Sequence, residues 1–327
     1  SVALHTGIFR VENVEVTKCG QAFNFGRYCT HSHMSQDMYG SYVKANSIHH
    51  SFQRAVTTHD THNWEGRDNV AFDITGHAYF VEDGTEHHNY LTGNLVAMVR
   101  RSSALLKSDM SPSGFWQATP MNFWRDNVAA HSASFGMWFE LVGEITPSHG
   151  HDRPTECPRF DQLGEFDNNT FHGNVVFGLR IYPQWTPLVD PCDHESSPDP
   201  QYLYNILSYR NGVGLFSKKH GSLHHFGGTF IDNAGSEISI VKHPYVDYDM
   251  NPIFKDALFV GTVDMTEFNE ETTDLGKFGI FGPQHEFFFV ANSTFVNYGA
   301  SGAISSCNGC LSGENMNQGG NTHRFTG

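Results

Sequence analysis

The sequence lacks an apolar run long enough to span a bilayer, and it shows no signal-peptide pattern. Basic residues are scarce, with 20 Lys and Arg against 35 Asp and Glu and a net charge of -15. Because nucleic-acid binding needs a basic face, this balance excludes a nucleic-acid partner. Helical periodicity of useful length is missing as well, which leaves a chain built from strands.

Histidine, by contrast, is abundant: the chain has 21, concentrated between Gly26 and His88. Imidazole is the commonest metal ligand and the side chain whose unperturbed charge changes near neutral pH. Protonation of every histidine would turn the net charge of -15 into +6, so the charge near pH 6 depends largely on histidine. What the cluster does depends on whether the fold brings its segments together.

The sequence contains an internal repeat, in which Asn precedes a short apolar strand and a small residue follows nine positions later. The shortest intervals, 23 residues from Asn46 to Asn69 and 25 from Asn69 to Asn94, have the length of a solenoid coil. A buried Asn can bond its amide to the same Asn one coil away, which explains the repeat better than a β-sandwich does. The pairs are Asn13/Ala22, Asn46/Ala55, Asn69/Ala78, Asn94/Ser103, Asn127/Gly136, Asn205/Gly214 and Asn292/Ser301, and Asn174 breaks the rule.

We therefore predict an all-β fold, a right-handed parallel β-helix that forms a single domain over residues 1–327. Polar, Pro- and Gly-rich stretches at about 143–169 and 183–201 are expected to be long loop insertions. Neither end is polar enough to cap a solenoid, so we expect a segment of a larger protein.

The six cysteines permit three disulfides, which an extracellular setting would favour. Cys157 and Cys192 lie in the two insertions and could join them. Cys307 and Cys310 could form half of a zinc site, but without a second CxxC we favour a local disulfide. The remaining cysteines are Cys19 and Cys29, and the sequons at Asn168 and Asn292 are compatible with secretion.

The repeat predicts which side chains stack. His31 and His33 point to the same face of one strand, because side chains alternate along it. The next coil offers His59 or His62, and a third coil offers Glu82 or His77. Such N and O ligands would suit Zn, Ni, Cu or Mn. The alternative is that these histidines only hydrogen-bond or stack; we interpret His49, His50, His87 and His88 as solvated, and His149, His151, His172, His224, His225 and His243 as surface or loop residues.

The column of His59 and Glu82 is expected to continue through Lys107, Glu140 and Lys218. Glu82 and Glu140 would then lie about 9.6 Å apart, two strand spacings, near the upper end of the ~6.5–9.5 Å range of inverting glycosidases. Asp83 would be an additional acid. The alternative is a structural charge ladder through Lys107.

Two further features could contact a glycan. Arg54 and His77 share a column and could bind an anionic group such as a uronate, unless Arg54 pairs with a nearby acid. Trp185 is the tryptophan most expected to be exposed as a sugar platform, whereas Trp138 is expected in the core.

Several motifs resemble the β-helix region of the fibrocystin-like family, which includes transmembrane protein 2 and the cell-migration-inducing hyaluronan-binding protein. They are GRYCTHSHM, SYVKANSIHHSFQRAVTTHDTH, GHAYFVEDGTEHHN, NVAAHSASFGMWFEL, LGEFDNNTFH and FGLRIYP. The resemblance implies a right-handed parallel β-helix in an extracellular or membrane-anchored protein, usually after a G8 domain, which is not found here. Two members are associated with hyaluronan binding or depolymerisation. The family motifs map onto Arg27, His31, His33, His59, His77, Glu82 and Asp83.

The sequence departs from the family where Cys-Thr-His-Ser-His replaces the expected Pro-Ile-His-Phe-His; both histidines are kept, but the strand geometry comes into question. Two functions follow. The first is an extracellular or cell-surface module, and the cell surface could be that of a cilium or flagellum. This module would bind a divalent transition metal and would contact a glycan, another extracellular protein or copies of itself. The second is a polysaccharide-degrading enzyme, a metal-assisted hydrolase or lyase, with Glu82, Asp83 and Glu140 as catalytic candidates.

Overall fold

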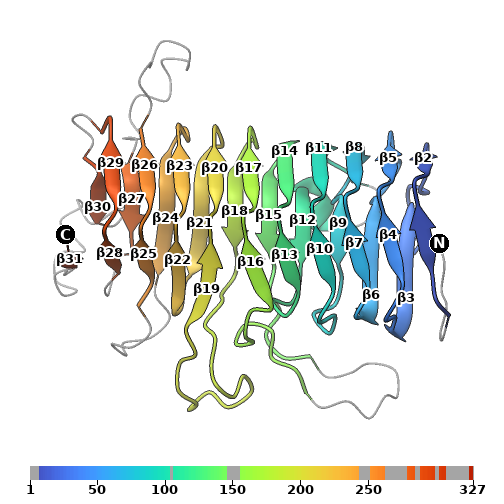
Figure 1. Ribbon diagram of the computed structural model, residues 1–327, viewed down its shortest axis with the longest axis horizontal. Helices are drawn as coiled ribbons and strands as arrows, with labels where there is room; N and C mark the ends of the chain where they lie inside the picture. Colours follow the sequence, from blue (N-terminus) through green and yellow to red (C-terminus); the bar gives the residue numbers. More distant parts are fainter. Residues whose placement is uncertain are drawn as a thin grey trace.

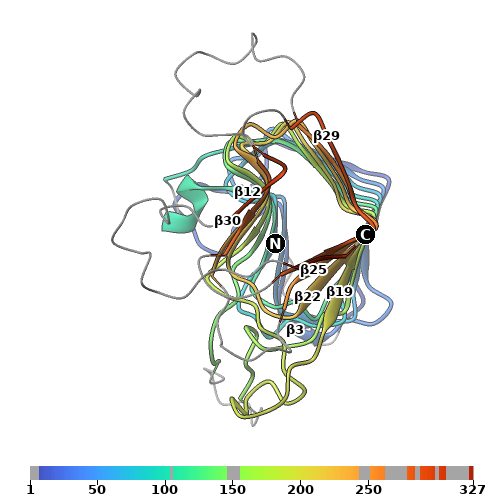
Figure 2. The ribbon, with the colours of Figure 1, turned by 90° about the vertical axis from the view of Figure 1, so that its left-hand side faces the viewer.

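The computed structural model describes residues 7–103, 106–145, 155–242, 251–261, 278–283, 288–298, 302–306 and 324–326. Its strands form three sheets in which every pair of neighbours is parallel, and successive strands along the chain belong to the first, second and third sheet in turn. The chain therefore winds as a parallel β-helix, which confirms the predicted fold (Figures 1 and 2). In the described residues, no helix is long and apolar enough to cross a membrane.

The first sheet has 11 short strands. In most of them the middle residue points inward, because side chains alternate along a strand. The strands are β1 (Arg10–Glu12), β4 (Tyr42–Lys44), β7 (Glu65–Arg67), β10 (Tyr90–Thr92), β13 (Phe123–Arg125), β16 (Glu165–Asp167), β19 (Gln201–Tyr204), β22 (Leu223–Phe226), β25 (Ile253–Lys255), β28 (Phe289–Ala291) and β31 (Arg324–Thr326).

The second sheet has 10 strands, and its inner column stacks apolar residues such as Ile48, Ala71, Val96 and Ala129. These side chains are completely buried, so they form one wall of the core. The strands are β2 (Glu15–Thr17), β5 (Ser47–His49), β8 (Val70–Thr75), β11 (Leu95–Arg100), β14 (Val128–Ser132), β17 (Thr170–His172), β20 (Leu207–Tyr209), β23 (Thr229–Ile231), β26 (Leu258–Val260) and β29 (Thr294–Val296).

The third sheet also has 10 strands and includes the longest one, β3. A short 3-10 helix, η1 (Lys107–Met110), precedes its fourth strand. The strands are β3 (Thr30–Asp37), β6 (Val56–His62), β9 (Tyr79–Val81), β12 (Ser113–Gln117), β15 (Phe135–Phe139), β18 (Phe177–Ile181), β21 (Val213–Lys219), β24 (Ser236–Lys242), β27 (Phe278–Gly282) and β30 (Ile304–Ser306).

A ladder of buried asparagine amides runs along the turn between the first and second sheets. Each Nδ2 donates to the Oδ1 of the next Asn at 3.0 Å, through Asn46, Asn69, Asn94, Asn127 and Asn169. Each of these amides also donates to a strand carbonyl, as Asn94 Nδ2 does to Gly66 O at 2.8 Å. The ladder thus satisfies buried polar groups within the stack.

The expected membership of this ladder was partly wrong. Asn13, Asn205 and Asn292 lie one residue earlier in the turn, where φ is 56°, 51° and 45° and the side chains are exposed. Asn is tolerated in that left-handed conformation, so these residues shape the turn instead of joining the ladder. Asn169 is the true member, and its small partner nine residues on is Gly178. Asn174 belongs to a second ladder with Asn211 and Asn233.

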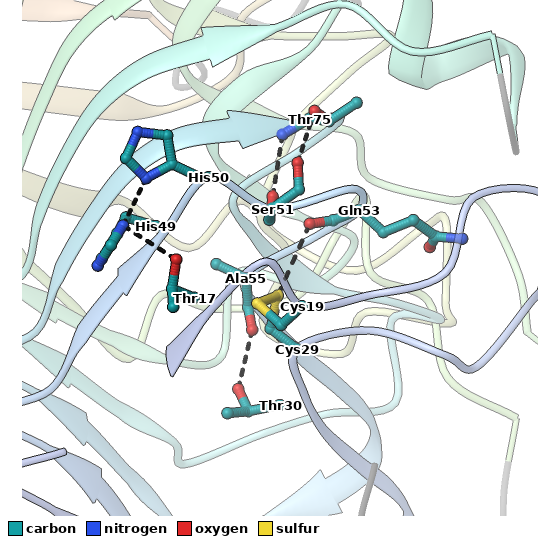
Figure 3. Close-up of a disulfide and its surroundings, with 10 residues drawn as sticks. All are labelled: Thr17, Cys19, Cys29, Thr30, His49, His50, Ser51, Gln53, Ala55 and Thr75. Carbon is teal, nitrogen blue, oxygen red and sulfur yellow. Dashed lines mark hydrogen bonds between the residues drawn. A yellow bond between two sulfur atoms is a disulfide. The ribbon is translucent and has the colours of Figure 1, made fainter. Parts of the chain in front are cut away.

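Two disulfides lie in the described residues. Cys19 and Cys29, with Cα atoms 4.9 Å apart, close a loop directly before β3, where Thr30 Oγ1 donates to Ala55 O at 2.9 Å (Figure 3). The cysteine that departs from the family motif therefore leaves the strand intact. Cys157 and Cys192 join two loops that project from the corner between the third and first sheets (Figure 2). Cys307 and Cys310 lie outside the described residues.

Trp185 is not an exposed sugar platform. It is completely buried, its Nε1 donates to Asp161 O at 3.1 Å, and its ring stacks on Phe139 at 4.9 Å. The loop after β18 folds back onto the core, which the polar composition of the insertion does not reveal. The other four tryptophans are also buried, with at most 7% of their surface exposed.

His225 was expected at the surface but points into the core. It is 2% exposed, lies 3.2 Å from His220 through their Nε2 atoms, and stacks on Phe254 at 4.8 Å. Burial, and secondarily the proximity of His224, lowers the pKa of His225 to about 3. The ring is therefore neutral in the fold at physiological pH.

Replacing Asn94 by Ala is expected to reduce the free energy of unfolding by about 3 kcal/mol, because it orphans several buried groups. The Asn69 backbone N–H and the Tyr79 hydroxyl lose their acceptor, Asn94 Oδ1, which lies 3.2 and 2.9 Å away, and Gly66 O loses Asn94 Nδ2 as a donor. The control Asn205→Gly, in the exposed left-handed position, should cost less than about 1 kcal/mol. Urea denaturation measures both, and equal losses would contradict a structural role for the ladder.

Acid should destabilise the fold partly through His225. Its folded pKa lies below its ordinary value of 6.5, so the unfolded state binds the proton first and stability falls as pH decreases from 6.5 toward 3. His225→Leu removes this proton uptake. Between pH 6 and pH 4, the free energy of unfolding plotted against pH should therefore have a slope smaller by about 1.4 kcal/mol per pH unit. The exposed control His50→Asn should keep the wild-type slope. An unchanged slope in His225→Leu would show that His225 protonates freely in the folded protein.

Candidate functional site

The candidate site begins on the outer face of the third sheet. His31 and His33 point outward from β3, while Thr30 and Ser32 take the intervening inward positions. His33 pairs with His59 on β6, and Glu82 N donates to Thr58 O at 2.9 Å, which places Glu82 beside His59. Three successive coils thus contribute to one place.

The structure brings together His31, His59 and Glu82, whose ligand atoms all lie within 4.8 Å of one another. The His33 ring lies beside them, with its centroid 5.1 Å from His31 and 4.7 Å from His59. His31 Nε2 and Glu82 Oε2 are buried and have no hydrogen-bond partner. Buried polar atoms are normally bonded, so these two orphans fit a set of ligands around an ion. Two imidazoles and a carboxylate are also the donors that a transition metal with open positions takes.

His31 is prepared to act as a ligand. Its Nδ1 lies 3.0 Å from Gly26 O, which can only accept, so Nδ1 carries the proton and Nε2 presents its lone pair. Burial lowers the pKa of His31 to about 4. The ring is therefore neutral at pH 7, as metal coordination requires.

His59 behaves in the opposite way. Burial opposes its protonation, but the hydrogen bond and charge of Asp83, aided by Glu82 and Glu86, raise its pKa to about 9. The Asp83 Oδ2 atom lies 2.5 Å from His59 Nε2. A metal at this position must displace a proton, so its affinity would rise with pH. Burial raises the pKa of Glu82 as well.

His77 does not join this group, which corrects its prediction as a metal ligand. The side chain is completely buried, its Nδ1 lies 3.0 Å from Ser113 Oγ, and its ring lies 5.4 Å from that of Phe80. It lies at the opposite end of β9 from Glu82, so the strand separates it from the site.

Arg54 is also unavailable as an anion site. Both Arg54 and Asp109 are completely buried, with Arg54 Nη2 2.9 Å from Asp109 Oδ2. The guanidinium lies over the Phe80 ring at 3.4 Å from its centroid. Asp109 belongs to η1, which nothing in the sequence pattern indicated. Its carboxylate also accepts the His77 backbone N–H.

The helix η1 changes the predicted carboxylate column. Lys107 begins η1 and lies outside the column, because residues 101–112 are inserted before β12. Ala118 takes its place between Glu82 and Glu140. The two glutamates therefore share a face at two strand spacings, without a lysine to form a charge ladder. Burial raises the pKa of each.

Glu86 was missed at the sequence level. It is completely buried and accepts the backbone N–H groups of Asp60, Asp83 and Gly84 at 2.8–3.0 Å. Burial, and secondarily Asp83, raises its pKa to about 7. By fixing the turn after β9 it positions Asp83 against His59. A carboxylate two residues beyond a turn glycine could have suggested this role.

The match to a family of known proteins agrees with this architecture. Residues 2–179 match the family described as CEMIP beta-helix, and the chain belongs to this family. It is 34% identical over 295 residues to fibrocystin-L of Mus musculus, covering 88% of this chain and 7% of that protein. It is 32% identical over 200 residues to the cell surface hyaluronidase CEMIP2 of Homo sapiens, covering 51% of this chain and 14% of that protein. The chain thus spans a small part of these relatives. The mannuronan C-5 epimerase AlgE4 A-module of Azotobacter vinelandii aligns with a TM-score of 0.43 and 13% identity, over 83% of this chain and 68% of that one.

Replacing Asp109 by Asn should reduce the free energy of unfolding by about 3–5 kcal/mol at pH 7, because it leaves the Arg54 charge buried and unpaired. Burial opposes ionisation of Asp109, but His77 and Arg54 keep its pKa below the ordinary 3.8. Its contribution is thus present above about pH 4 and is lost as pH falls further. The surface control Glu12→Gln, which breaks the 2.8 Å pair with Lys44, should cost far less than Asp109→Asn, because solvent screens this exposed pair. Denaturant titration checks both, and a similarly small loss in Asp109→Asn would contradict the buried pair.

Proposed function

We propose that this domain binds an acidic glycan at a divalent transition metal held by His31, His59 and Glu82. The convergence of these three ligand atoms within 4.8 Å on an outer sheet face carries the proposal. The relatives add the class of ligand, since one is named a cell surface hyaluronidase and another a cell migration-inducing and hyaluronan-binding protein.

The chemistry of the ligands supports this choice. Imidazole and carboxylate together suit Zn, Ni, Cu or Mn better than Ca or Mg, which prefer oxygen ligands alone. Three protein ligands leave open positions, which carboxylate or hydroxyl oxygens of a sugar can occupy. Asp83 would orient the His59 ring through its contact with Nε2. Glu86 would hold Asp83 in place by accepting its backbone N–H.

The setting proposed is extracellular or at a cell surface. The two disulfides fit such a compartment. The sequon residues Asn168 and Asn292 are both exposed at the corner between the first and second sheets. Glycans attached there would leave the outer face of the third sheet free.

A second candidate function is cleavage of the bound glycan. Glu82 and Glu140 share a face two strand spacings apart, about 9.6 Å, and burial raises both pKa values, as suits a general acid. Asp83 is the third acid in this region, although its partner in the structure is His59.

One set of measurements tests both functions. Purified wild-type protein should carry a transition metal by elemental analysis and should bind hyaluronan, and a chelator should weaken hyaluronan binding at least tenfold. His31→Ala and His59→Ala should each reduce metal affinity by about 10-fold to 100-fold or more, as losses of ligands or of their orientation do. The control His50→Asn, an exposed residue after β5, should change neither property.

Metal-free protein that binds hyaluronan equally well would contradict the proposal. The size of the polymer after incubation separates the two functions. Shortened chains that depend on Glu82 and Glu140 would establish cleavage, and unchanged chains would leave binding as the function.

A further inference from the structure

The outer face of the second sheet is apolar along most of its length. From β8 to β29, the outward positions of its described strands form two columns without Asp, Glu, Lys or Arg. Aliphatic, aromatic and threonine side chains fill both columns, and one histidine is the exception. The first column is Val70, Leu95, Val128, Thr170, Leu207, Thr229, Leu258 and Thr294, and the second is Phe72, Ala97, Ala130, His172, Tyr209, Ile231, Val260 and Val296.

Such a surface is unexpected on a chain with a net charge of -15. Outward positions of the first sheet carry charges, as Arg125 does. Side chains at both ends of the apolar columns remain open to solvent, since Val70, Phe72, Leu95 and Val296 are 38–42% exposed. Soluble monomers rarely expose contiguous apolar patches larger than a few hundred Å². This face therefore has the character of an interface with another molecule.

The two edges of this face carry charges of opposite sign. Its strands begin at the corner with the first sheet, where the exposed Asp68 and Asp126 occupy turn positions with φ of 55° and 56°. The strands end at the corner with the third sheet, where Arg100, Arg101 and Arg210 are exposed. We call these the acidic edge and the basic edge.

Two of the three arginines on the basic edge are paired within the chain. Arg100 Nε lies 2.7 Å from Asp73 Oδ1, and Arg210 Nε lies 3.4 Å from Asp232 Oδ2. Arg101 contacts only the carbonyl of Ala133, at 3.4 Å, and forms no ion pair with a carboxylate among the described residues. The charge of Arg101 is therefore the one most available to another molecule.

We infer that the outer face of the second sheet is the interface of a homodimer, in which two copies of this chain pack sheet against sheet. A two-fold axis parallel to the β-helix axis keeps every coil at its own level and exchanges the two edges. The acidic edge of one copy then faces the basic edge of the other. Asp68, Gly93 and Asp126 follow one another on successive coils. Arg101 would lie at the level of Gly93, with one acid a coil below and one a coil above.

The alternative two-fold axis, across the β-helix, would place acidic edge against acidic edge. Like charges in contact are unfavourable, so the charges of the two edges select the parallel axis. The same rotation places the candidate metal sites of the two copies at the same level. The interface itself does not depend on those sites, because the second and third sheets form different walls of the β-helix (Figure 2).

The size and shape of the face suit a second copy. Seven strand spacings give a length of about 34 Å, and five residues across, edges included, give a width of about 17 Å. The product, roughly 600 Å² per copy, lies at the lower end of stable interfaces. Paired sheets stack face to face in this way in β-sandwiches. A peptide strand would need a free sheet edge, whereas the strands between β8 and β26 have neighbours on both sides.

Analytical ultracentrifugation tests the dimer. The purified protein, examined up to about 100 µM, should show a reversible dimer of the 36.6 kDa chain. Leu95→Glu buries an unpaired charge in the interface and should raise the dissociation constant of the dimer about tenfold or more. Tyr90→Glu, a matched control on the exposed face of the first sheet, should dimerise as wild type does. Val70→Glu is the second interface variant if Leu95→Glu does not fold.

A charge exchange tests the orientation. Arg101→Glu and Asp68→Lys should each weaken the dimer at low salt, and the double variant should recover most of the loss, because the two charges attract again across the interface. A double variant that is weaker than both single variants would contradict the parallel two-fold axis.

Three results would overturn the homodimer at this face. The first is a wild-type protein that stays monomeric at every concentration. The second is a dimer that both Leu95→Glu and Val70→Glu leave unchanged, which would place the contact elsewhere. The third concerns the sequons at Asn168 and Asn292, which lie on the acidic edge. A glycosylated protein that dimerises only after its N-glycans are removed would show that glycans cover this face instead of a second copy.

Discussion

The structure depends on the register between successive coils. Parallel backbone pairing sets the distance between coils, and the buried amides from Asn46 to Asn169 fix which residue lies beside which. Because side chains alternate along each strand, a one-residue slip would exchange the inner and outer faces. Every column of side chains, inside and outside, follows from this constraint.

The candidate metal site is a direct result of that register. His31, His59 and Glu82 are far apart in the sequence, yet each occupies an outward position at the same end of the third sheet. Their surroundings then give them different properties. Gly26 O fixes the tautomer of His31, whereas Asp83 holds His59 in its protonated form in the absence of metal. A metal bound at this site would therefore release a proton.

Much of the outer face of the third sheet is covered by buried side chains of the protein itself. Aromatic rings and the buried Arg54–Asp109 pair make it rigid, while polar atoms along it lack partners. Arg54 belongs to the packing of this face, because its charge is neutralised inside the fold.

The sequence could predict the parallel β-helix, because the spacing of Asn and small residues directly records the coil length. It could also predict that His31, His33, His59 and Glu82 meet, since no insertion interrupts the coils between β3 and β9. It could not predict that Lys107 lies outside the column. Counting a fixed number of residues from each Asn takes no account of the insertion that contains η1. It could not show that Asn13, Asn205 and Asn292 lie outside the ladder, because Asn suits both the buried ladder position and the exposed left-handed position before it.

Local periodicity therefore determined the fold and the members of the histidine cluster. Tertiary packing alone decided which charges are neutralised, which rings are buried and which polar atoms are left without partners. Arg54, His77, His225 and Trp185 changed from surface candidates to buried residues for this reason. Burial and partner choice depend on loops and coils far away in the sequence, and no short-range pattern contains that information.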